Sequence, residues 1–563
     1  MRHAILSVLI CAIFTASLAA VGTDGVFQHG AVVCSEKHAA EVGADVLESG
    51  GNAVDAACAS ALAMAVTYPQ AGNIGGGGFA LIYWADSQKV FFLDFRETAP
   101  AAATARYFLD SAGNVDRDRA LAGPLAAGTP GTVAGLCEMH SRFGKTGWAE
   151  IARPALLLAD SGFEVSEKMS QDIVEYDTLL RRFPTTAAVF FSDDQPLEPS
   201  RILKQPDLAK ALGLIENHGR DGFYRGELAK AIADYCAQNG GLITIDDLEK
   251  YQPIWRRPIH VRFRELDIFM PGLPSSGGIV LGQILGMMDS LAVEKHAPDS
   301  PEYIHLFTEA ARRAYADRAA YLGDPAFTDD VTSRLLDRDY IIGRASSIDT
   351  NRATRSSDVR PGLSPGAEES KQTTHLVTAD VYGNIVSLTY TINTSFGSGA
   401  MVPGYGFLLN NEMDDFAIAP GSANAYGLVG GDANKIEGGK RMLSSMTPTI
   451  ILKAGRPYLA LGSPGGSRII TAVAQTILNY HVFGMSLPAA VAAPRFHHQW
   501  VPDSLFLEQN RYDDRIIERL TDMGHLVGRQ KPFAEVMAIG FSDNGTRLSA
   551  AADTRREGVV AGY

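Results

Sequence analysis

The chain contains 563 residues, and its formal net charge at pH 7 is −14. Nucleic acids and anionic membrane surfaces are bound through basic patches, so this acidic balance argues against both as partners. Hydrophobic residues make up 46% of the chain, which predicts a globular protein with a large core.

The N-terminus has the features of a secretory signal peptide. Arg2 and His3 form a short basic start, the stretch 4–18 is apolar, and small residues precede a cleavage site after Ala19. A signal anchor is the alternative, but the apolar run is short for a membrane span of about 20 residues. We therefore expect residues 1–19 to be removed and the mature protein to be periplasmic or secreted.

The first elements after this leader are two helices and two strands. Helices are predicted over 36–47 and from a cap at Asn52 or Gly51 to about residue 66. Strands are predicted over 79–84 and 90–95. The four glycines at 75–78 lack the lysine of a phosphate-binding loop, so we interpret them as a place of close backbone packing.

The middle of the chain, about 135–330, is predicted to be mostly helical. Its clearest helix is 301–321, where a proline suits the first helical position and the preceding serine can cap it. His305 on this helix is interpreted as a structural histidine. The polar stretch 348–371 contains prolines, glycines and serines and is typical of a mobile linker.

Cysteine usage gives neither a defined disulfide pattern nor a metal site. Several pairings are open to the cysteines that follow the leader, and the sequence does not choose among them. Their spacing matches no common set of metal ligands, so we expect no metal. We interpret them as small buried apolar residues: Cys34, Cys58, Cys137 and Cys236.

Two strand-like runs on either side of a turn at 381–384 predict a β-hairpin that begins at Thr373. Pairing Asp380 with Ile385 places Thr391 opposite the residue after Thr373. A one-residue bulge would place it opposite Thr373 itself. Further strands are predicted at 449–452 and 458–461, followed by a helix at 467–479.

Thr373 opens this hairpin directly after the polar linker, which makes it a candidate nucleophile. If the chain is cut between Gln372 and Thr373, the threonine gains a free α-amino group, whose ordinary pKa is about 7.7–8.0. That amine can take the hydroxyl proton near neutral pH, so one residue supplies nucleophile and base. On this segment alone, an ordinary strand that begins with two threonines is the more common explanation.

Longer strings of sequence favour the nucleophile. After residue 373 the chain reads TTHLVTAD, SLTYTINTSFGSG, GFLLNNEMDDF, YGLVGGDAN, KRMLSSMTPTI, GSPGGSRIITAV and APRFHHQW, and before it NIGGGGFA, DFRETAP and PGLPSSGG. In this order they resemble the γ-glutamyltranspeptidases, self-cleaving enzymes of the N-terminal-nucleophile hydrolase superfamily. The resemblance covers nearly the whole mature chain.

The resemblance implies a fold and a domain organisation. The fold class is α/β (α+β), an αββα sandwich in which two stacked sheets lie between helical layers. After the signal peptide 1–19, residues 20–372 would form a large subunit. Residues 373–563 would form a small subunit with an N-terminal threonine, and the two would stay together as a heterodimer.

It also implies the chemistry. Thr373 would attack the Gln372 carbonyl to cleave the chain, and then the γ-amide of glutathione or another γ-glutamyl compound. The resulting ester would pass its glutamyl group to water or to an amino-acid or dipeptide acceptor. This mechanism requires no cofactor.

Roles around the nucleophile follow from the same resemblance. Thr391 would orient the Thr373 hydroxyl, and Asn393 would contact polar groups of the substrate. Gly465 and Gly466, at the start of a helix, would supply backbone N–H groups to an oxyanion hole.

The glutamyl α-carboxylate and α-ammonium need partners of opposite charge. Arg96, with a planar fork that suits a carboxylate, would bind the former together with Ser444 and Ser445. Asp415, with Glu412 beside it, would accept the ammonium.

Two further features lie in the last third of the chain. The segment 420–434 resembles a lid over the pocket, which Tyr426 would close. His497 and His498 are adjacent on a predicted strand and therefore point to opposite faces, so we interpret both as structural.

Two alternatives remain at this point. One is a related acylase that removes a glutaryl-type side chain, as in cephalosporins. Its substrates lack the α-ammonium, so the presence of Asp415 favours the glutamyl interpretation. The other is a γ-glutamyl-binding protein that never cleaves itself.

Overall fold

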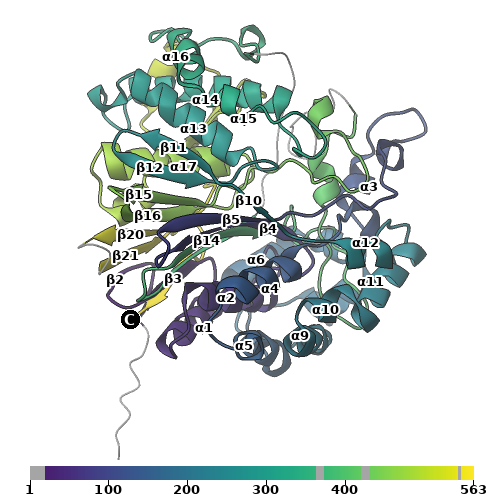
Figure 1. The fold of residues 1–563 in the computed structure, drawn as a ribbon. Coiled ribbons are helices and arrows are strands. Elements are labelled where there is room, and N and C mark those ends of the chain that lie inside the picture. Colours follow the sequence, from purple (N-terminus) through teal and green to yellow (C-terminus); the bar gives the residue numbers. More distant parts are fainter. Residues whose placement is uncertain (1–19, 363–372, 420–430, 543–546) are drawn as a thin grey trace, which may run out of the picture.

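The computed structural model describes residues 20–362, 373–419, 431–542 and 547–563. The described residues form two antiparallel sheets stacked between helical layers (Figure 1). One hydrophobic core lies on the outer side of the sheet that contains β13 (Thr374–Ala379), and the other extends from the space between the sheets to the helices that cover the second sheet. This is the expected αββα sandwich.

The first sheet has eight strands and contains the hairpin that begins after Thr373. All its neighbours are antiparallel. In spatial order the strands are β1 (Ala20–Gly22), β22 (Val559–Gly562), β3 (Ala31–Cys34), β13 (Thr374–Ala379), β14 (Ile385–Thr391), β4 (Gly77–Trp84), β5 (Lys89–Phe95) and β10 (Ile254–Arg256). β13 and β14 are central and buried throughout, which explains their continuous apolar and threonine-rich pattern.

The second sheet has seven antiparallel strands. Its order is β11 (Ile259–Phe263), β12 (Leu266–Met270), β15 (Thr449–Lys453), β16 (Arg456–Gly462), β20 (Met537–Ser542), β21 (Arg547–Ala552) and β2 (Asp24–Phe27). Smaller sheets are formed by β17 (Phe496–His497), β18 (Leu505–Glu508) and β19 (Val527–Gln530), by β6 (Phe163–Glu164) with β9 (Ile202–Leu203), and by β7 (Phe191–Ser192) with β8 (Gln195–Pro196). Both large sheets combine strands from before and after Thr373.

Helices cover the two outer faces (Figure 1). Over the eight-stranded sheet lie α1 (Lys37–Glu48), α2 (Ala53–Thr67), α4 (Thr132–Phe143), α5 (Trp148–Ser161) and α9 (Pro206–His218). Over the seven-stranded sheet lie α13 (Gly277–Ser290), α14 (Pro301–Tyr321), α16 (Arg338–Ser346) and α17 (Arg468–Ile477). The remaining helices are α3 (Arg117–Leu121), α6 (Glu167–Glu175), α7 (Asp177–Leu180), α8 (Pro184–Phe190), α10 (Arg220–Tyr224), α11 (Gly226–Gln238), α12 (Ile245–Lys250), α15 (Thr332–Leu335), α18 (Leu487–Ala492) and α19 (Asp514–Asp522). Within the described ranges, no helix combines the length and apolarity that crossing a bilayer requires.

Local signals in the sequence fix several of these elements. α2 begins after Asn52, which caps it. The Asn52 side chain accepts a hydrogen bond from Asp55 N, and the Asp55 carboxylate accepts one from Asn52 N. α14 spans the predicted 301–321, and the Ser300 hydroxyl accepts from Tyr303 N at 3.2 Å. The predicted helix at 467–479 is instead an α-helix to Ile477, followed by one π-helical turn.

The four-glycine stretch packs closely, as predicted. A Cβ atom at Gly76 would lie 1.9 Å from the carbonyl oxygen of Thr391, and one at Gly78 would lie 2.3 Å from that of Thr389. Only glycine allows β14 to approach this closely. The glycines thereby bring the end of β14 against the start of β4.

The prediction of a mobile linker over 348–371 is wrong for residues 348–362, the part that the structure describes. Residues 363–371 lie outside the described residues, as does the predicted signal peptide. The preceding stretch is anchored rather than mobile, because its backbone amides are bound: Ala353 N donates to Met523 O at 2.7 Å, and Ser356 N donates to Asp503 Oδ2 at 2.8 Å. The four cysteines are free thiols, three of them buried and Cys137 half-buried.

Candidate active site

The hairpin β13–β14 brings Thr373 and Thr391 together. Its register pairs Ala379 with Ile385 and continues to Thr374 opposite Tyr390, so one further step puts Thr373 opposite Thr391. The predicted pairing of Asp380 with Ile385 is therefore wrong by one residue, although the hairpin contains no bulge.

Asp380 belongs to the turn because its carboxylate caps it. Its Oδ1 accepts from Tyr382 N at 2.8 Å and from Asn384 N at 2.9 Å. A capping aspartate is a common turn device that strand pattern alone does not reveal.

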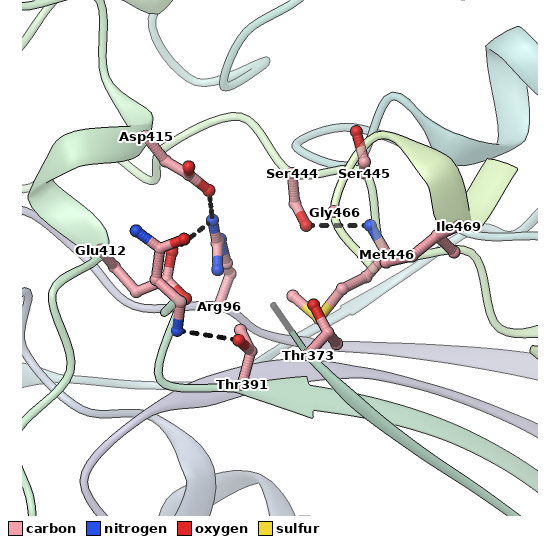
Figure 2. A pocket seen from close by; sticks show the side chains of 11 residues that line it. Arg96, Thr373, Thr391, Glu412, Asp415, Ser444, Ser445, Met446, Gly466 and Ile469 are labelled. Carbon is pink, nitrogen blue, oxygen red and sulfur yellow. Dashed lines mark hydrogen bonds and ion pairs between the residues drawn. The ribbon is translucent and has the colours of Figure 1, made fainter. Parts of the chain in front are cut away.

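A pocket lies at this end of the hairpin (Figure 2). Almost all of the predicted site residues line it. They are Thr373, Thr391, Asn393, Gly466, Arg96, Glu412, Asp415, Ser444 and Ser445, joined by Met446 and Ile469. Met446 and Ile469 were not predicted, because their apolar side chains carry no chemical signal of their own.

Three predicted residues stand apart from this group. Gln372 and Tyr426 lie outside the described residues. Gly465 lines a neighbouring cavity with Arg468, Arg555 and Arg556, whereas Gly466 lines the pocket of Thr373. The two glycines thus face different spaces.

One side of the pocket surrounds Thr373, the predicted nucleophile, and we call it the nucleophile side. Its polar groups are uncharged, and backbone atoms hold two of them. Thr373 is 4% exposed. Asn393 N donates to Thr391 Oγ1 at 2.8 Å, so the Thr391 hydroxyl hydrogen is directed to a different acceptor. The Asn393 amide donates to Asn411 O at 2.9 Å, which holds that side chain at the pocket wall.

Gly465 and Gly466 form the turn between β16 and α17. Their φ angles are +128° and +58°, the region that favours glycine. α17 begins at Arg468, so the turn stands at a helix N-terminus, where backbone N–H groups favour negative charge. Gly466, facing the pocket, is in the better position to serve an oxyanion there.

The opposite side is charged. The Arg96 guanidinium is almost fully buried, and its Nη2 lies 2.6 Å from Asp415 Oδ2 and 2.8 Å from Glu412 Oε2 (Figure 2). Its Nη1 lies 3.4 Å from Glu97 Oε2. Burial opposes the charge of Arg96, but the three carboxylates outweigh it and hold its pKa above the ordinary value.

Three carboxyl groups around one guanidinium cannot all ionise at low cost. Burial raises the pKa values of Glu412 and Glu97, so these groups tend to keep a proton. Burial also raises the pKa of Asp415, against the charge of Arg96. Within the described chain, Oδ1 of Asp415 has no hydrogen-bond partner, so it can accept from an ammonium group.

The histidines that were interpreted as structural do not line this pocket and are bound elsewhere. His305 Nδ1 and His525 Nε2 are 2.8 Å apart, and His497 bonds Thr471 Oγ1 and Gln499 Oε1 at 2.8 Å each. Among the residues with described positions, no group of His, Cys, Asp and Glu is arranged to hold a metal ion.

The family model described as Gamma-glutamyltranspeptidase matches residues 39–563. This chain belongs to the γ-glutamyltranspeptidase family. It is 43% identical to a glutathione hydrolase proenzyme of Pseudomonas aeruginosa, covering 98% of this chain and 97% of the relative. It is 42% identical to a glutathione hydrolase proenzyme of Escherichia coli (strain K12), covering 95% of this chain and 92% of the relative.

Solved structures of the superfamily share the fold. The cephalosporin acylase from Bacillus halodurans superposes with a TM-score of 0.85 at 25% identity, over 96% of this chain and 97% of the acylase. The αββα architecture is therefore common to members that act on different acyl groups, and the substrate has to be argued from the pocket.

Proposed function

We propose that this chain is a self-cleaving γ-glutamyltranspeptidase and glutathione hydrolase. Thr373 would cleave the chain at Gln372–Thr373 and then act on the γ-glutamyl amide of glutathione and related compounds. The observation that carries the proposal is one pocket that contains a strand-opening threonine together with an arginine and an aspartate.

The cleavage step needs only the chain itself and water. The Thr373 hydroxyl oxygen attacks the Gln372 carbonyl carbon, the peptide nitrogen leaves with a proton, and an ester joins the two residues. Water then opens the ester, which gives a Gln372 carboxylate and a free Thr373 amine and hydroxyl. The products would be a large subunit 20–372 and a small subunit 373–563. Interleaving of strands from both pieces in each sheet supports their staying together.

In the mature enzyme, the freed amine would take the Thr373 hydroxyl proton as the oxygen attacks the γ-carbonyl carbon. Thr391 would orient the hydroxyl. Gly466 N–H would stabilise the oxyanion, an interaction worth about 3–4 kcal/mol in comparable sites. The leaving amine takes a proton, and a γ-glutamyl ester remains on Thr373.

The charged side would hold the ends of the glutamyl group. Arg96, Ser444 and Ser445 would bind the α-carboxylate, and Asp415 with Glu412 the α-ammonium. Water then releases glutamate, or an amino-acid or dipeptide amine takes the glutamyl group. No cofactor takes part in these steps.

The first experiment is intact mass under denaturing conditions for the wild type and Thr373→Ala. We expect two pieces from the wild type, the smaller beginning at Thr373, and one uncut chain from the variant. A γ-glutamyl anilide assay should show at least about 10⁴-fold less activity for the variant. An uncut, inactive wild type would instead favour a γ-glutamyl-binding protein.

The substrate distinguishes a γ-glutamyltranspeptidase from the alternative, an acylase of glutaryl compounds. The Asp415 carboxylate supports a substrate with an α-ammonium group, which glutaryl compounds lack. Matched γ-glutamyl and glutaryl amides measure the choice directly, and a preference for the glutaryl amide would overturn the proposal.

We also propose export of the mature enzyme to the periplasm or the medium after removal of residues 1–19. N-terminal sequencing of the large piece, purified from each cell fraction, tests the location and the cleavage point together. A large piece that still carries residues 1–19 would contradict it.

A further inference from the structure

The string PGLPSSGG lies far from Thr373 in sequence, yet it forms the support of the serine loop in the pocket. Ser275 and Ser444 form a parallel bridge, and Ser276 N donates to Ser444 O at 2.8 Å. Ser275 Oγ donates to Met446 O at 2.6 Å. The backbone of the pocket serines is therefore fixed from behind by this string.

A second buried arginine stands behind these serines. Arg318, on α14, is 4% exposed. Its Nε donates to Ser276 Oγ at 2.8 Å, and its Nη2 lies 3.5 Å from Ser445 Oγ. Its charge also acts on the Asp415 carboxylate, although burial and Arg96 have the larger effects on the pKa of that group.

The donors and acceptors around Arg318, Ser276 and Ser445 limit where each hydroxyl hydrogen can lie. A guanidinium only donates, and a serine hydroxyl has one hydrogen. Ser276 Oγ accepts from Arg318 and donates to Ser444 O at 2.7 Å, so its hydrogen is committed. Ser445 therefore faces donors of Arg318 and an oxygen of Ser276 that has no hydrogen to give. Because Ser445 Oγ faces a donor of Arg318, its own hydrogen has two acceptors: Ser276 Oγ at 3.5 Å, the limit of a hydrogen bond, and a substrate carboxylate in the pocket that Ser445 lines. The carboxylate is charged and is the stronger acceptor of the two.

The geometry points to Arg318 as a positioning residue that, with Ser276, orients the Ser445 hydroxyl to donate to the α-carboxylate of the substrate. The inference rests on the proposed γ-glutamyl activity. Arg318 acts through Ser445, whereas Arg96 lies in the pocket itself.

The test compares two substrates, γ-glutamyl anilide and its analogue with the α-carboxylate changed to a carboxamide. In Arg318→Met, the ratio of kcat/KM for the carboxylate over the carboxamide should fall about tenfold, as for a lost hydrogen bond to a charged group. The change should come from KM of the carboxylate substrate, with kcat nearly constant. An unchanged ratio overturns the inference.

A control on the same helix separates positioning from packing. Arg313 is also buried in α14 and bonds Glu309 Oε2 at 2.7 Å, away from the pocket. Arg318→Lys keeps the charge but loses the fork, and it should lower the ratio, whereas Arg313→Lys should not. An equal fall in both variants would mean a structural role and overturn the inference.

Coupling to Ser445 gives the sharpest readout. If Arg318 acts through Ser445, then Arg318→Met combined with Ser445→Ala should have the same ratio as Ser445→Ala alone. If the two substitutions lower the ratio additively, Arg318 does not act through Ser445. Should Arg318→Met fail to fold, Ser276→Ala removes the same orienting contact and must also lower the ratio.

The wild type serves as the reference for both claims. A wild type that neither cleaves itself nor acts on γ-glutamyl anilide refutes the proposed function. A wild type that does both, with an unchanged ratio in the folded variants, refutes only the role of Arg318. Intact mass of every variant ensures that only cleaved enzyme is compared.

Discussion

The two sides of the pocket are positioned in different ways. On the nucleophile side, Thr373 and Thr391 are placed by the ladder of the central hairpin, and the Thr391 hydroxyl accepts from the backbone N–H of Asn393. On the charged side, Arg96 and Asp415 come from segments about 320 residues apart and hold each other by an ion pair. Backbone register thus places the proposed nucleophile, while side-chain charge places the proposed substrate-binding groups. Changes on the two sides should therefore affect different kinetic constants.

The largest effect that separates the sides is expected for Asp415→Asn. It removes a charged partner of the α-ammonium, so kcat/KM for a γ-glutamyl amide should fall about 10–100-fold, mostly through KM. The matched glutaryl amide should change by less than about twofold. Steady-state kinetics on both amides measures this.

Asp414→Asn is the matched control for that substitution. Asp414 is an adjacent buried aspartate that pairs with Arg117 at 3.0 Å. This variant should leave the preference between the two amides unchanged. If both variants shift it equally, Asp415 has no specific role in binding the ammonium.

A change on the nucleophile side should act on kcat. Thr391→Ala removes the hydroxyl that would orient Thr373, and we expect kcat to fall about tenfold with KM nearly constant. Thr391→Ser restores the hydroxyl and should recover most of the rate. Pre-steady-state release of the anilide reports the acylation step, and a pure KM effect would contradict the assignment.

The close packing of the glycines at 75–78 against β14 can be tested by measuring the free energy of unfolding. At Gly76 a Cβ would meet the Thr391 carbonyl oxygen at 1.9 Å, so Gly76→Ala should cost about 1–3 kcal/mol of unfolding free energy. Gly343→Ala is the control. Gly343 lies at an exposed helical position where an added Cβ would meet no neighbouring atom within 4 Å, so this substitution should be neutral or slightly stabilising. Denaturant unfolding measures both, and equal stabilities would contradict the packing argument.

The smallest expected effect is a change with pH in the stability that the charged side contributes. Burial raises the pKa of Glu97 from 4.5 to about 7, so the folded protein keeps a proton that the unfolded chain releases. Stability from this group is complete below about pH 4.5 and is lost as pH rises through about 7. The melting temperature should therefore fall from pH 5 to pH 8, and less so in Glu97→Gln. Replacing the exposed Glu249 by glutamine should leave the slope unchanged.

The sequence by itself determined the elements whose causes are local. A proline, a capping serine and helical spacing define α14, and the Asn52 cap defines the start of α2. The glycines at 75–78 predict close backbone packing, because a residue with a side chain would not fit there. The resemblance then grouped most of the residues that line the pocket, including Thr373, Arg96 and Asp415.

Tertiary structure decided what depends on partners distant in the chain. It turned Gly466 toward the pocket and Gly465 toward another cavity. It also buried Arg318 behind Ser445. Propensity and periodicity act over a few residues, whereas these outcomes depend on which oxygen and nitrogen atoms meet once separate segments pack, and that information is not local to any segment.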